Sequence, residues 1–547
     1  MTSIPYTKFP NSSENFPDLF TDYIYFYNKV EKYFNHNFRN QESWDTLCFN
    51  LSQRKYNRSE LVQVLTEQNR SIHCSVSTLA NIDLLYNDNC FAVVTGQQIG
   101  LLSGHLYTIY KLITAIKLSE SLKISHPSYS FVPVFWCDTE DHDFLEINNL
   151  KVIDTQNNIS TLEYFINETP QTKFISPTGN LKFDGKIKQF IEQLKGMLVS
   201  TEFTPPLFAN IDNIFIEGKS FYESFAEFLN HLFHQFGVIF INPNAPKLKH
   251  LAKDIFIKEL TSASEVSKRV IQTSAELEEI YHVQIKSKPI NLFLFHKDGR
   301  YSIEPQGDHF FLKNSRQTFT LEEMKNLATN SPELFSPNVV LRPIYQDTIL
   351  PTITYVAGPA EVAYFAQLKD VYNLFDIPMP IIYPRASITL VEKKISNISE
   401  KFNLKLKEMI MNPSEVQNII KEQDGDVDLD ELYSSLSTKI KNSTNEIQFA
   451  LLQIDPTLEG SVNSFIQKTE SLLQVLKEKT LQAKANRDII TQNQYLKLMN
   501  NIFPLTSPQE RIFNITYYLN KYGPDFINWL YTETNPQLFE HQLIEID

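Results

Sequence analysis

Several carboxylates and one imidazole lie close together in the stretch FWCDTEDHDFLEINNL. Asp138, Glu140, Asp141 and His142 directly follow a run of apolar residues. Carboxylates bind Mg²⁺ through oxygen, and a carboxylate or an imidazole can take a proton from a substrate ammonium group. A solvated acidic loop is the alternative, but bulky apolar residues flank the acidic run, and burying them beside acids that contact nothing is costly. We therefore predict that Asp138 binds substrate and that Glu140, Asp141 and His142 are catalytic, with His142 as the candidate base.

A glycine-rich turn follows an earlier apolar run. The sequence VVTGQQIGLLSGHLYTIYK places Gly96, Gly100 and Gly104 between a β-branched stretch and a helical one. Backbone N–H groups at such a turn, together with the positive end of the next helix dipole, can bind phosphate or carboxylate. The spacing matches neither the dinucleotide fingerprint nor the P-loop, and tight strand–helix packing without a ligand is the open alternative. The predicted anion-binding residues are Gly96, Gln97, Gln98, Gly100, Gly104, His105, Thr108 and Lys111.

A third group of polar residues interrupts the apolar stretch SPNVVLRPIYQDTILPTITYVAGPAEVAYF. Arg342 can bind a substrate carboxylate through two parallel N–H bonds. A structural salt bridge to Asp347 or Glu361 is the equally open alternative. Arg385 ends the later apolar run PMPIIYPR. Besides Asp138, the predicted substrate-binding residues are Arg342, Gln346, Asp347, Gly358, Glu361 and Arg385.

Short apolar runs and helical patterns alternate through the region that contains these residues. The runs FAVVTG, SFVPVFWC, FGVIFINP, TITYVAG and PMPIIYPR have the composition of buried strands. A strongly apolar helix is expected between the first two, from about Leu106 to Lys123. This order predicts a parallel sheet with right-handed crossovers, and so a doubly wound α/β core. In such sheets ligands bind at the carboxyl ends of the strands, where the polar groups fall.

The sequence between about 390 and 500 is charged, nearly free of glycine and helical in pattern. Apolar residues recur there at spacings of three, four and seven, with an Asp-Pro break at 455–456. Two long helices that fold back on each other as an antiparallel coiled coil fit this pattern. Such a coiled coil can stabilise a dimer or hold a neighbouring domain, and a helical domain without a partner is the alternative. The predicted seam consists of Leu429, Leu432, Leu436, Ile440, Ile447, Leu451, Ile454, Leu458, Val462, Phe465, Leu472 and Val475.

These changes in pattern define the expected domains. Residues 1–88 form an N-terminal helical segment, and 89–389 form the α/β core with insertions near 145–235 and 250–335. Residues 390–500 form the coiled-coil domain, and 501–547 form a helical segment that packs on the core.

The bulk properties of the 547 residues exclude several classes of partner. The net charge of −14 argues against broad binding to nucleic acid or anionic membranes. No apolar stretch is long enough to span a bilayer, and the first residues lack the pattern of a secretory signal. The four cysteines show neither zinc-binding spacing nor the density of a disulfide framework. We expect a cytoplasmic protein that acts on small molecules.

Several long segments, taken together, resemble one family, the cysteine ligases of bacillithiol biosynthesis (BshC). They are VVTGQQIGLLSGHLYTIYK, VPVFWCDTEDHDFLEIN, SPNVVLRPIYQDTILPTITYVAGPAEVAYFAQLK, PMPIIYPRASITLVE and PQERIFN, in the order that the family has. The resemblance implies a Rossmann-like core akin to that of class I aminoacyl-tRNA synthetases, with insertions and a coiled coil that forms a homodimer. The family usually has proline where His105 stands, and the signature motifs of the synthetases are not recognisable.

The resemblance also implies a reaction, the last step of bacillithiol synthesis. The amine of cysteine would join the malyl carboxylate of glucosaminyl malate in an amide bond, driven by ATP with Mg²⁺. The Gly96–Lys111 turn would then bind phosphate or malyl carboxylates, and Arg342 and Arg385 would neutralise carboxylates. The acidic group would position Mg²⁺ or the cysteine amine. The alternatives are a ligase or nucleotidyltransferase of the same fold that acts on another acid, and a non-catalytic nucleotide-binding scaffold.

Overall fold

The computed structural model describes residues 2–10, 12–141, 143–166, 177–297, 299–307, 309–411, 416 and 428–546. The chain forms two compact units. One comprises Met1–Leu390 and Ile502–Ile546, and the other comprises Val391–Asn501. The segment after the coiled coil therefore belongs to the same unit as the α/β core.

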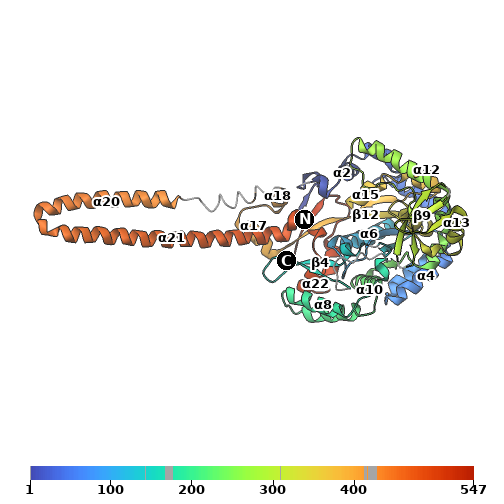
Figure 1. The fold of residues 1–547 in the computed structure, drawn as a ribbon, viewed down its shortest axis with the longest axis horizontal. Helices are drawn as coiled ribbons and strands as arrows, with labels where there is room; N and C mark the ends of the chain where they lie inside the picture. Colours follow the sequence, from blue (N-terminus) through green and yellow to red (C-terminus); the bar gives the residue numbers. More distant parts are fainter. Residues whose placement is uncertain are drawn as a thin grey trace. The chain divides into compact units, whose positions relative to one another are not determined.

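A five-stranded parallel sheet forms the centre of the larger unit (Figure 1). Its strands are β2 (Cys90–Gln98), β3 (Ser130–Asp138), β6 (Ile239–Ile241), β12 (Thr352–Ala357) and β13 (Ile381–Pro384). The spatial order is β13-β12-β2-β3-β6, and every pairing is parallel. This is the doubly wound order 3-2-1-4-5, in which the direction of winding reverses between the first strand, β2, and the fourth, β12. The predicted Rossmann-like core is confirmed.

The central strands consist of apolar residues because both faces of the sheet are covered. Residues 131–137 of β3 are all buried, as are 90–96 of β2. Helix α6 (Leu106–Ser125) connects these two strands and is itself buried over most of its length. Helices α15 (Pro359–Phe365) and α16 (Lys369–Phe375) connect β12 to β13, and α14 (Leu341–Ile349) precedes β12.

Two insertions extend the core. The first contains α7 (Phe144–Ile147), the hairpin β4 (Asn149–Ile153) and β5 (Ile159–Glu163), α8 (Lys186–Met197), α9 (Thr204–Ile214) and α10 (Phe221–Phe233). The second contains α11 (Pro246–Leu251), α12 (Lys253–Glu278), α13 (Leu321–Asn330) and an antiparallel sheet. The strands of that sheet are β7 (Leu292–His296), β8 (Gly299–Gln306), β9 (His309–Leu312), β10 (Thr318–Thr320) and β11 (Phe335–Pro337), in the order β10-β9-β8-β7-β11.

The two ends of the chain lie side by side and are not helical throughout, contrary to the prediction for 1–88 and 501–547. The helices there are α1 (Ser12–Asn15), α2 (Asp18–Tyr25), α3 (Gln41–Gln53), α4 (Arg58–Ser71), α5 (Val76–Leu84), α22 (Thr516–Tyr522) and α23 (Phe526–Glu533). Strand β1 (Thr2–Ile4) pairs with β15 (His541–Ile546), which lies beside β14 (Ser387–Glu392). The prediction missed these short strands because each is completed by a partner distant in sequence.

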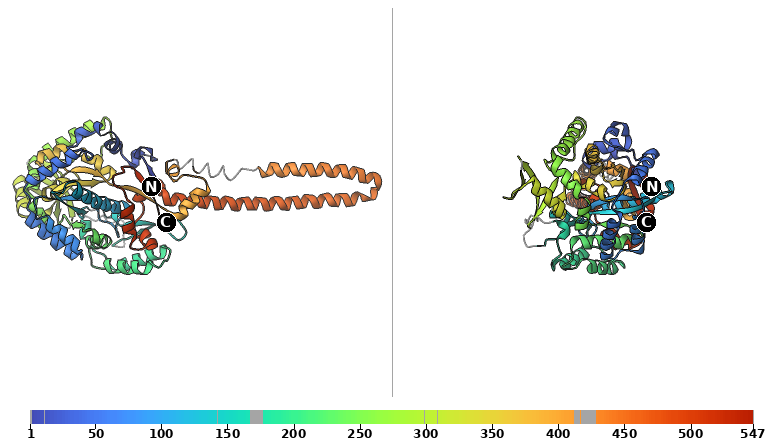
Figure 2. Two further views of the ribbon diagram at one scale, coloured as in Figure 1. Left: turned by 180° about the vertical axis from the view of Figure 1, so that it is seen from behind. Right: turned by 90° about the vertical axis from the view of Figure 1, so that its right-hand side faces the viewer.

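The smaller unit contains α17 (Lys393–Lys401), α18 (Leu406–Met411) and a long hairpin of α20 (Leu429–Ile454) and α21 (Glu459–Ile502). The hairpin helices run side by side in Figure 1 and in the left view of Figure 2, which confirms the antiparallel coiled coil. The hydroxyl groups of Tyr433 and Thr480 meet between them at 2.7 Å. Among the described residues, no helix is both long enough and apolar enough to cross a membrane.

The predicted seam of the coiled coil agrees only in part with the contact between the two helices, since Val462 belongs to both. Tyr433, Thr444 and Val462 are buried there, whereas Leu432, Ile447, Phe465 and Leu472 are 52%, 53%, 59% and 71% exposed. Tyr433 and Thr444 each lie close in sequence to an exposed apolar residue, so the heptad spacing alone does not decide which stripe faces the other helix.

Candidate functional site

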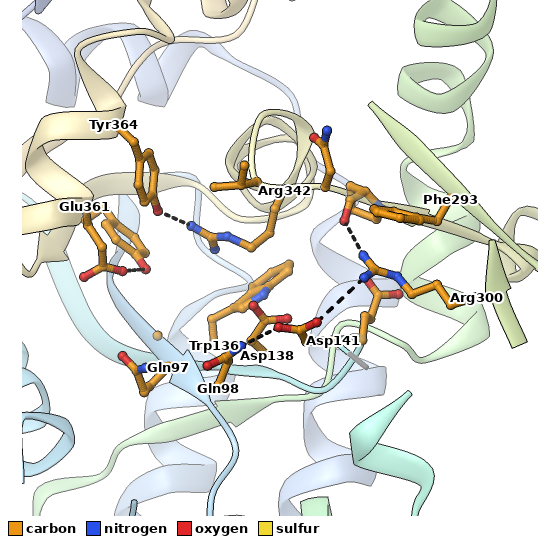
Figure 3. A pocket seen from close by; sticks show the side chains of 16 residues that line it. Gln97, Gln98, Trp136, Asp138, Asp141, Phe293, Arg300, Arg342, Glu361 and Tyr364 are labelled. Carbon is orange, nitrogen blue, oxygen red and sulfur yellow. Dashed lines mark hydrogen bonds and ion pairs between the residues drawn. The ribbon is translucent and has the colours of Figure 1, made fainter. Parts of the chain in front are cut away.

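A cavity of about 400 Å³ opens at the carboxyl ends of the central strands (Figure 3). It lies where the strand order reverses between β2 and β12, the place where doubly wound sheets bind ligands. Its volume is in the range of small-molecule sites. The lining residues are Gly96, Gln97, Gln98, Trp136, Asp138, Glu140, Asp141, Phe293, Arg300, Pro337, Asn338, Val339, Arg342, Tyr355, Glu361 and Tyr364.

The acidic side of the cavity comes from the end of β3. Asp138 is the last residue of β3 and pairs in register with Gln98 of β2. Burial raises the pKa of Asp138 to about 6, with the nearby positive charge of Arg342 opposing the shift and the carboxylate of Asp141 adding to it. A carboxyl group with this pKa can exchange a proton near neutral pH.

Asp141 is held by groups from two other elements. The side-chain amide of Gln98 donates to its carboxylate, and also to that of Glu146 at 3.0 Å. The guanidinium of Arg300, from β8 of the inserted sheet, lies 3.9 Å from Asp141. These contacts fix the carboxylate of Asp141 at the rim of the cavity.

Glu140 pairs with a buried lysine that the sequence analysis did not identify. The ammonium group of Lys249, from α11, contacts the Glu140 carboxylate and donates to the backbone carbonyl of Phe335 at 2.9 Å. It also lies 5.0 Å from the ring centre of Tyr345. Because Glu140 is already neutralised by this partner, it is better suited to shaping the site than to transferring protons.

Arg342 provides positive charge on the opposite side of the cavity. Its guanidinium donates to the side-chain oxygen of Gln346 at 3.2 Å and to the Tyr364 hydroxyl at 3.1 Å, and it lies over the ring of Tyr355. The salt bridges considered for it are absent among the described residues, since Asp347 and Glu361 have other partners.

The inserted sheet adds a second arginine to the cavity. Arg300 stacks on the ring of Phe293 with 3.9 Å to the ring centre, and it donates to Ser336 Oγ at 2.9 Å and to the carbonyl of Pro337 at 3.1 Å. The sequence offered no signal for it, because Arg300 lies in a polar strand far from the apolar runs that mark the core. Lys249 was missed for a similar reason.

The glycines of the turn after β2 have structural reasons of their own. A Cβ atom at Gly96 would lie 2.8 Å from the carbonyl oxygen of Trp136 on the neighbouring strand, and one at Gly100 would lie 3.2 Å from the Cα of Gly104. Gly104 has a positive φ of 65°. Close packing accounts for glycine at positions 96 and 100 and the left-handed backbone for Gly104, and of the three only Gly96 lines the cavity.

The start of α6 is covered by the segment before α22. The backbone N–H of Leu106 donates to the carbonyl of Phe513 at 2.9 Å, and the side chain of Asn514 donates to the carbonyl of Gly104 at 2.6 Å. Burial lowers the pKa of His105 to about 4. Gly100, Gly104, His105 and Thr108 therefore lie away from the lining of the cavity.

Lys111 holds residues of the cavity lining in place without lining the cavity itself. Its ammonium group donates to the carbonyl of Gly96 at 2.8 Å and to the side-chain oxygen of Gln97 at 3.1 Å, and it pairs with Glu361 at 2.5 Å. Glu361 also accepts a hydrogen bond from the Tyr355 hydroxyl at 2.9 Å. Protein acceptors surround this lysine, which makes it a positioning residue.

Other predicted residues lie outside the lining. The Arg385 guanidinium forms a buried ion pair with Glu510 at 2.6 Å. Asp347 is buried and accepts hydrogen bonds from Tyr372 at 2.5 Å and from Gln346 at 2.8 Å. Gln346 and Gly358 also stand behind the cavity wall rather than on it.

The predicted catalytic base and the metal remain predictions. His142 lies outside the described residues. Within the ranges that the structure describes, no three His, Cys, Asp or Glu side chains are placed to hold a metal ion.

Family models match nearly the whole chain. Residues 4–386 match the model described as Bacillithiol biosynthesis BshC, N-terminal Rossmann-like domain, and 388–546 match Bacillithiol biosynthesis BshC, C-terminal coiled-coil domain. A protein of Chloroherpeton thalassium named "Putative cysteine ligase BshC" is 35% identical, over 99% of this chain and 99% of its own. Proteins of the same name from Salinibacter ruber and Bacillus cytotoxicus are 31% and 28% identical, over 97% and 96% of this chain and 96% and 97% of theirs. The chain belongs to the bacillithiol biosynthesis BshC family.

Proposed function

We propose that this chain is a ligase that joins the amine of cysteine to the malyl carboxylate of glucosaminyl malate, with ATP as the energy source. This is the last step of bacillithiol biosynthesis, and the names of its relatives support cysteine as a substrate. The observation with most weight is that Arg342 and Asp138 line one cavity at the reversal of the strand order. Ligation requires a carboxylate and an amine side by side, and opposite charges in one cavity suit that task.

The carboxylate has to be activated, because amide formation from a free carboxylate is unfavourable in water. Transfer of a phosphoryl or adenylyl group from ATP to a malyl oxygen gives an acyl phosphate or acyl adenylate and releases ADP or pyrophosphate. The ammonium group of cysteine gives one proton to the Asp138 carboxylate. The neutral nitrogen then bonds to the acyl carbon, phosphate or AMP departs with the malyl oxygen, and a second proton leaves the nitrogen.

The residues at the end of β2 are the proposed contacts of the ATP phosphates. Gly96, Gln97 and Gln98 line the cavity there. Arg300 and Arg342 supply positive charge for the anionic groups of the substrates. Mg²⁺ would enter with the phosphates.

We also propose that the coiled coil forms a homodimer. Leu432, Ile447, Phe465 and Leu472 are more than half exposed on a single hairpin. A second copy that packs on this stripe would remove these side chains from water.

The test is an assay of the purified protein with ATP, Mg²⁺, L-cysteine and glucosaminyl malate, in which mass spectrometry detects the amide and chromatography identifies AMP or ADP. Wild type should form the amide, and Arg342→Gln and Asp138→Asn should form it at least about 100-fold more slowly. Lys268→Gln, an exposed position on α12, is the control. Turnover only with a different acid would favour another ligase of the same fold. ATP binding without any product would favour a scaffold.

A further inference from the structure

Trp136 lines the cavity and carries a buried hydrogen-bond donor without a partner among the described residues. Its side chain lines the cavity and is 1% exposed, and the indole N–H has no acceptor among the residues that the structure describes. The ring is fixed edge-on against Tyr345, with ring centres 5.4 Å apart. A buried N–H without a partner is unfavourable, so an acceptor supplied by a ligand would be bound strongly there.

Arg342 offers further donors to the same region. A guanidinium group has five N–H bonds, and Arg342 donates from one terminal nitrogen to Gln346 and from the other to Tyr364. The Tyr355 and Tyr364 side chains orient the group, while the remaining N–H bonds can reach a ligand. An indole N–H beside a guanidinium is a donor set suited to a carboxylate.

Asp138 completes the arrangement with the opposite charge. Trp136 and Asp138 are two residues apart on β3, so their side chains leave the same face of the sheet, with Cα atoms about 7 Å apart. Figure 3 shows the ring of Trp136 between the guanidinium of Arg342 and the carboxylate of Asp138. Donors for an anion and an acceptor for a cation are thus close together.

We propose that Trp136, Arg342 and Asp138 form the subsite for the α-amino acid substrate. Trp136 Nε1 and Arg342 bind its α-carboxylate, and Asp138 faces its ammonium group. An α-amino acid has both charges on one carbon, as this short arrangement requires. The malyl group, with two carboxylates and no ammonium group, would be repelled by the Asp138 carboxylate. This assignment rests on the proposed function, because it locates one of the two organic substrates of that reaction.

The test compares L-cysteine with cysteamine, which has the same amine and thiol but no carboxylate. In Trp136→Phe the ring remains and the N–H is lost, so the ratio of kcat/KM for L-cysteine to that for cysteamine should fall about tenfold. Trp529→Phe, which changes a tryptophan stacked on Phe526 in α23, is the matched control and should keep the wild-type ratio. Arg342→Lys should lower the ratio at least as much, because it removes the bidentate fork.

Each other outcome has a stated meaning. An unchanged ratio in both Trp136→Phe and Arg342→Lys overturns the assignment, as does a rise in KM for glucosaminyl malate with an equal loss for both amines. If wild type makes no amide at all, the proposed function fails. Calorimetric titration with L-cysteine and with cysteamine then decides the subsite. A preference for L-cysteine that disappears in Trp136→Phe supports it, and the absence of a preference in wild type overturns it.

Discussion

The ammonium group of Lys111 lies 2.5 Å from a carboxylate oxygen of Glu361, and this buried ion pair joins α6 to the first turn of α15. Lys111 also donates to the carbonyl of Gly96 at the end of β2. Glu361 accepts the backbone N–H of Gly358 at 2.6 Å, directly after β12. The pair therefore links the two strands between which the strand order reverses.

Replacing Lys111 with Met should destabilise the protein by about 3–5 kcal/mol, because it leaves the Glu361 carboxylate unpaired in a buried site. Urea unfolding with an unchanged m-value measures the loss. Lys268→Met, at an exposed ion pair with Glu265, should cost less than about 1 kcal/mol. Unchanged stability together with lost ATP binding would instead support the phosphate contact predicted from the sequence.

Arg342 and Arg385 should respond differently to substitution by Gln. Arg385→Gln should cost about 3–5 kcal/mol, since it leaves Glu510 buried without its partner, and the added change Glu510→Gln should recover part of that loss. Arg342→Gln should reduce kcat/KM with a much smaller change in the urea midpoint. Equal losses of activity per folded molecule in both variants would show that Arg385 also contacts substrate.

The pH dependence should follow Asp138. Because burial raises its pKa to about 6, kcat/KM should rise with pH through about 6 and then level off, and Asp138→Asn should lack this rise. Stability should change with pH in the opposite direction. The raised pKa of Asp138 stabilises the folded state fully at pH values below 3.8, and this contribution is lost as the pH rises through about 6. At pH 7, Asp138→Asn should be more stable than wild type by ~1–2 kcal/mol, with a smaller difference at pH 4. A wild-type rise that persists in Asp138→Asn would assign the base elsewhere.

The coiled coil gives a prediction about oligomeric state. Leu472 is 71% exposed on one hairpin, so Leu472→Glu should convert the proposed dimer to a monomer without loss of helix content. Analytical ultracentrifugation and circular dichroism measure the two properties. Lys479→Glu, a change of charge on the same helix, is the control. A wild-type monomer at micromolar concentration would contradict the dimer.

The sequence predicted the architecture well where the physical signal is local. β2, β3, β12 and β13 are runs of apolar residues because both faces of the sheet are covered, and α6 begins at the predicted Leu106. The carboxyl ends of these strands supply Gly96 and Asp138 to the cavity, as the rule for doubly wound sheets leads one to expect.

Contacts between distant parts of the chain were not predictable in this way. The glycine turn resembles an anion-binding loop in composition, but Phe513 and Asn514, some 400 residues later, cover the start of α6. Arg300 in the cavity wall and Lys249, which pairs with Glu140 behind it, come from an insertion that contains no recognisable motif. The heptad spacing does not decide which side chains of α20 face α21, since buried Tyr433 lies next to exposed Leu432 in the sequence.

The placement of Arg300 and Phe293 in the cavity wall makes the inserted antiparallel sheet part of the binding surface. The five parallel strands and Asp138 can then stay constant while a separate module alters the shape and charge of the cavity. Selectivity could be redesigned by grafting or randomising β7 and β8 alone, leaving the scaffold that folds the protein untouched.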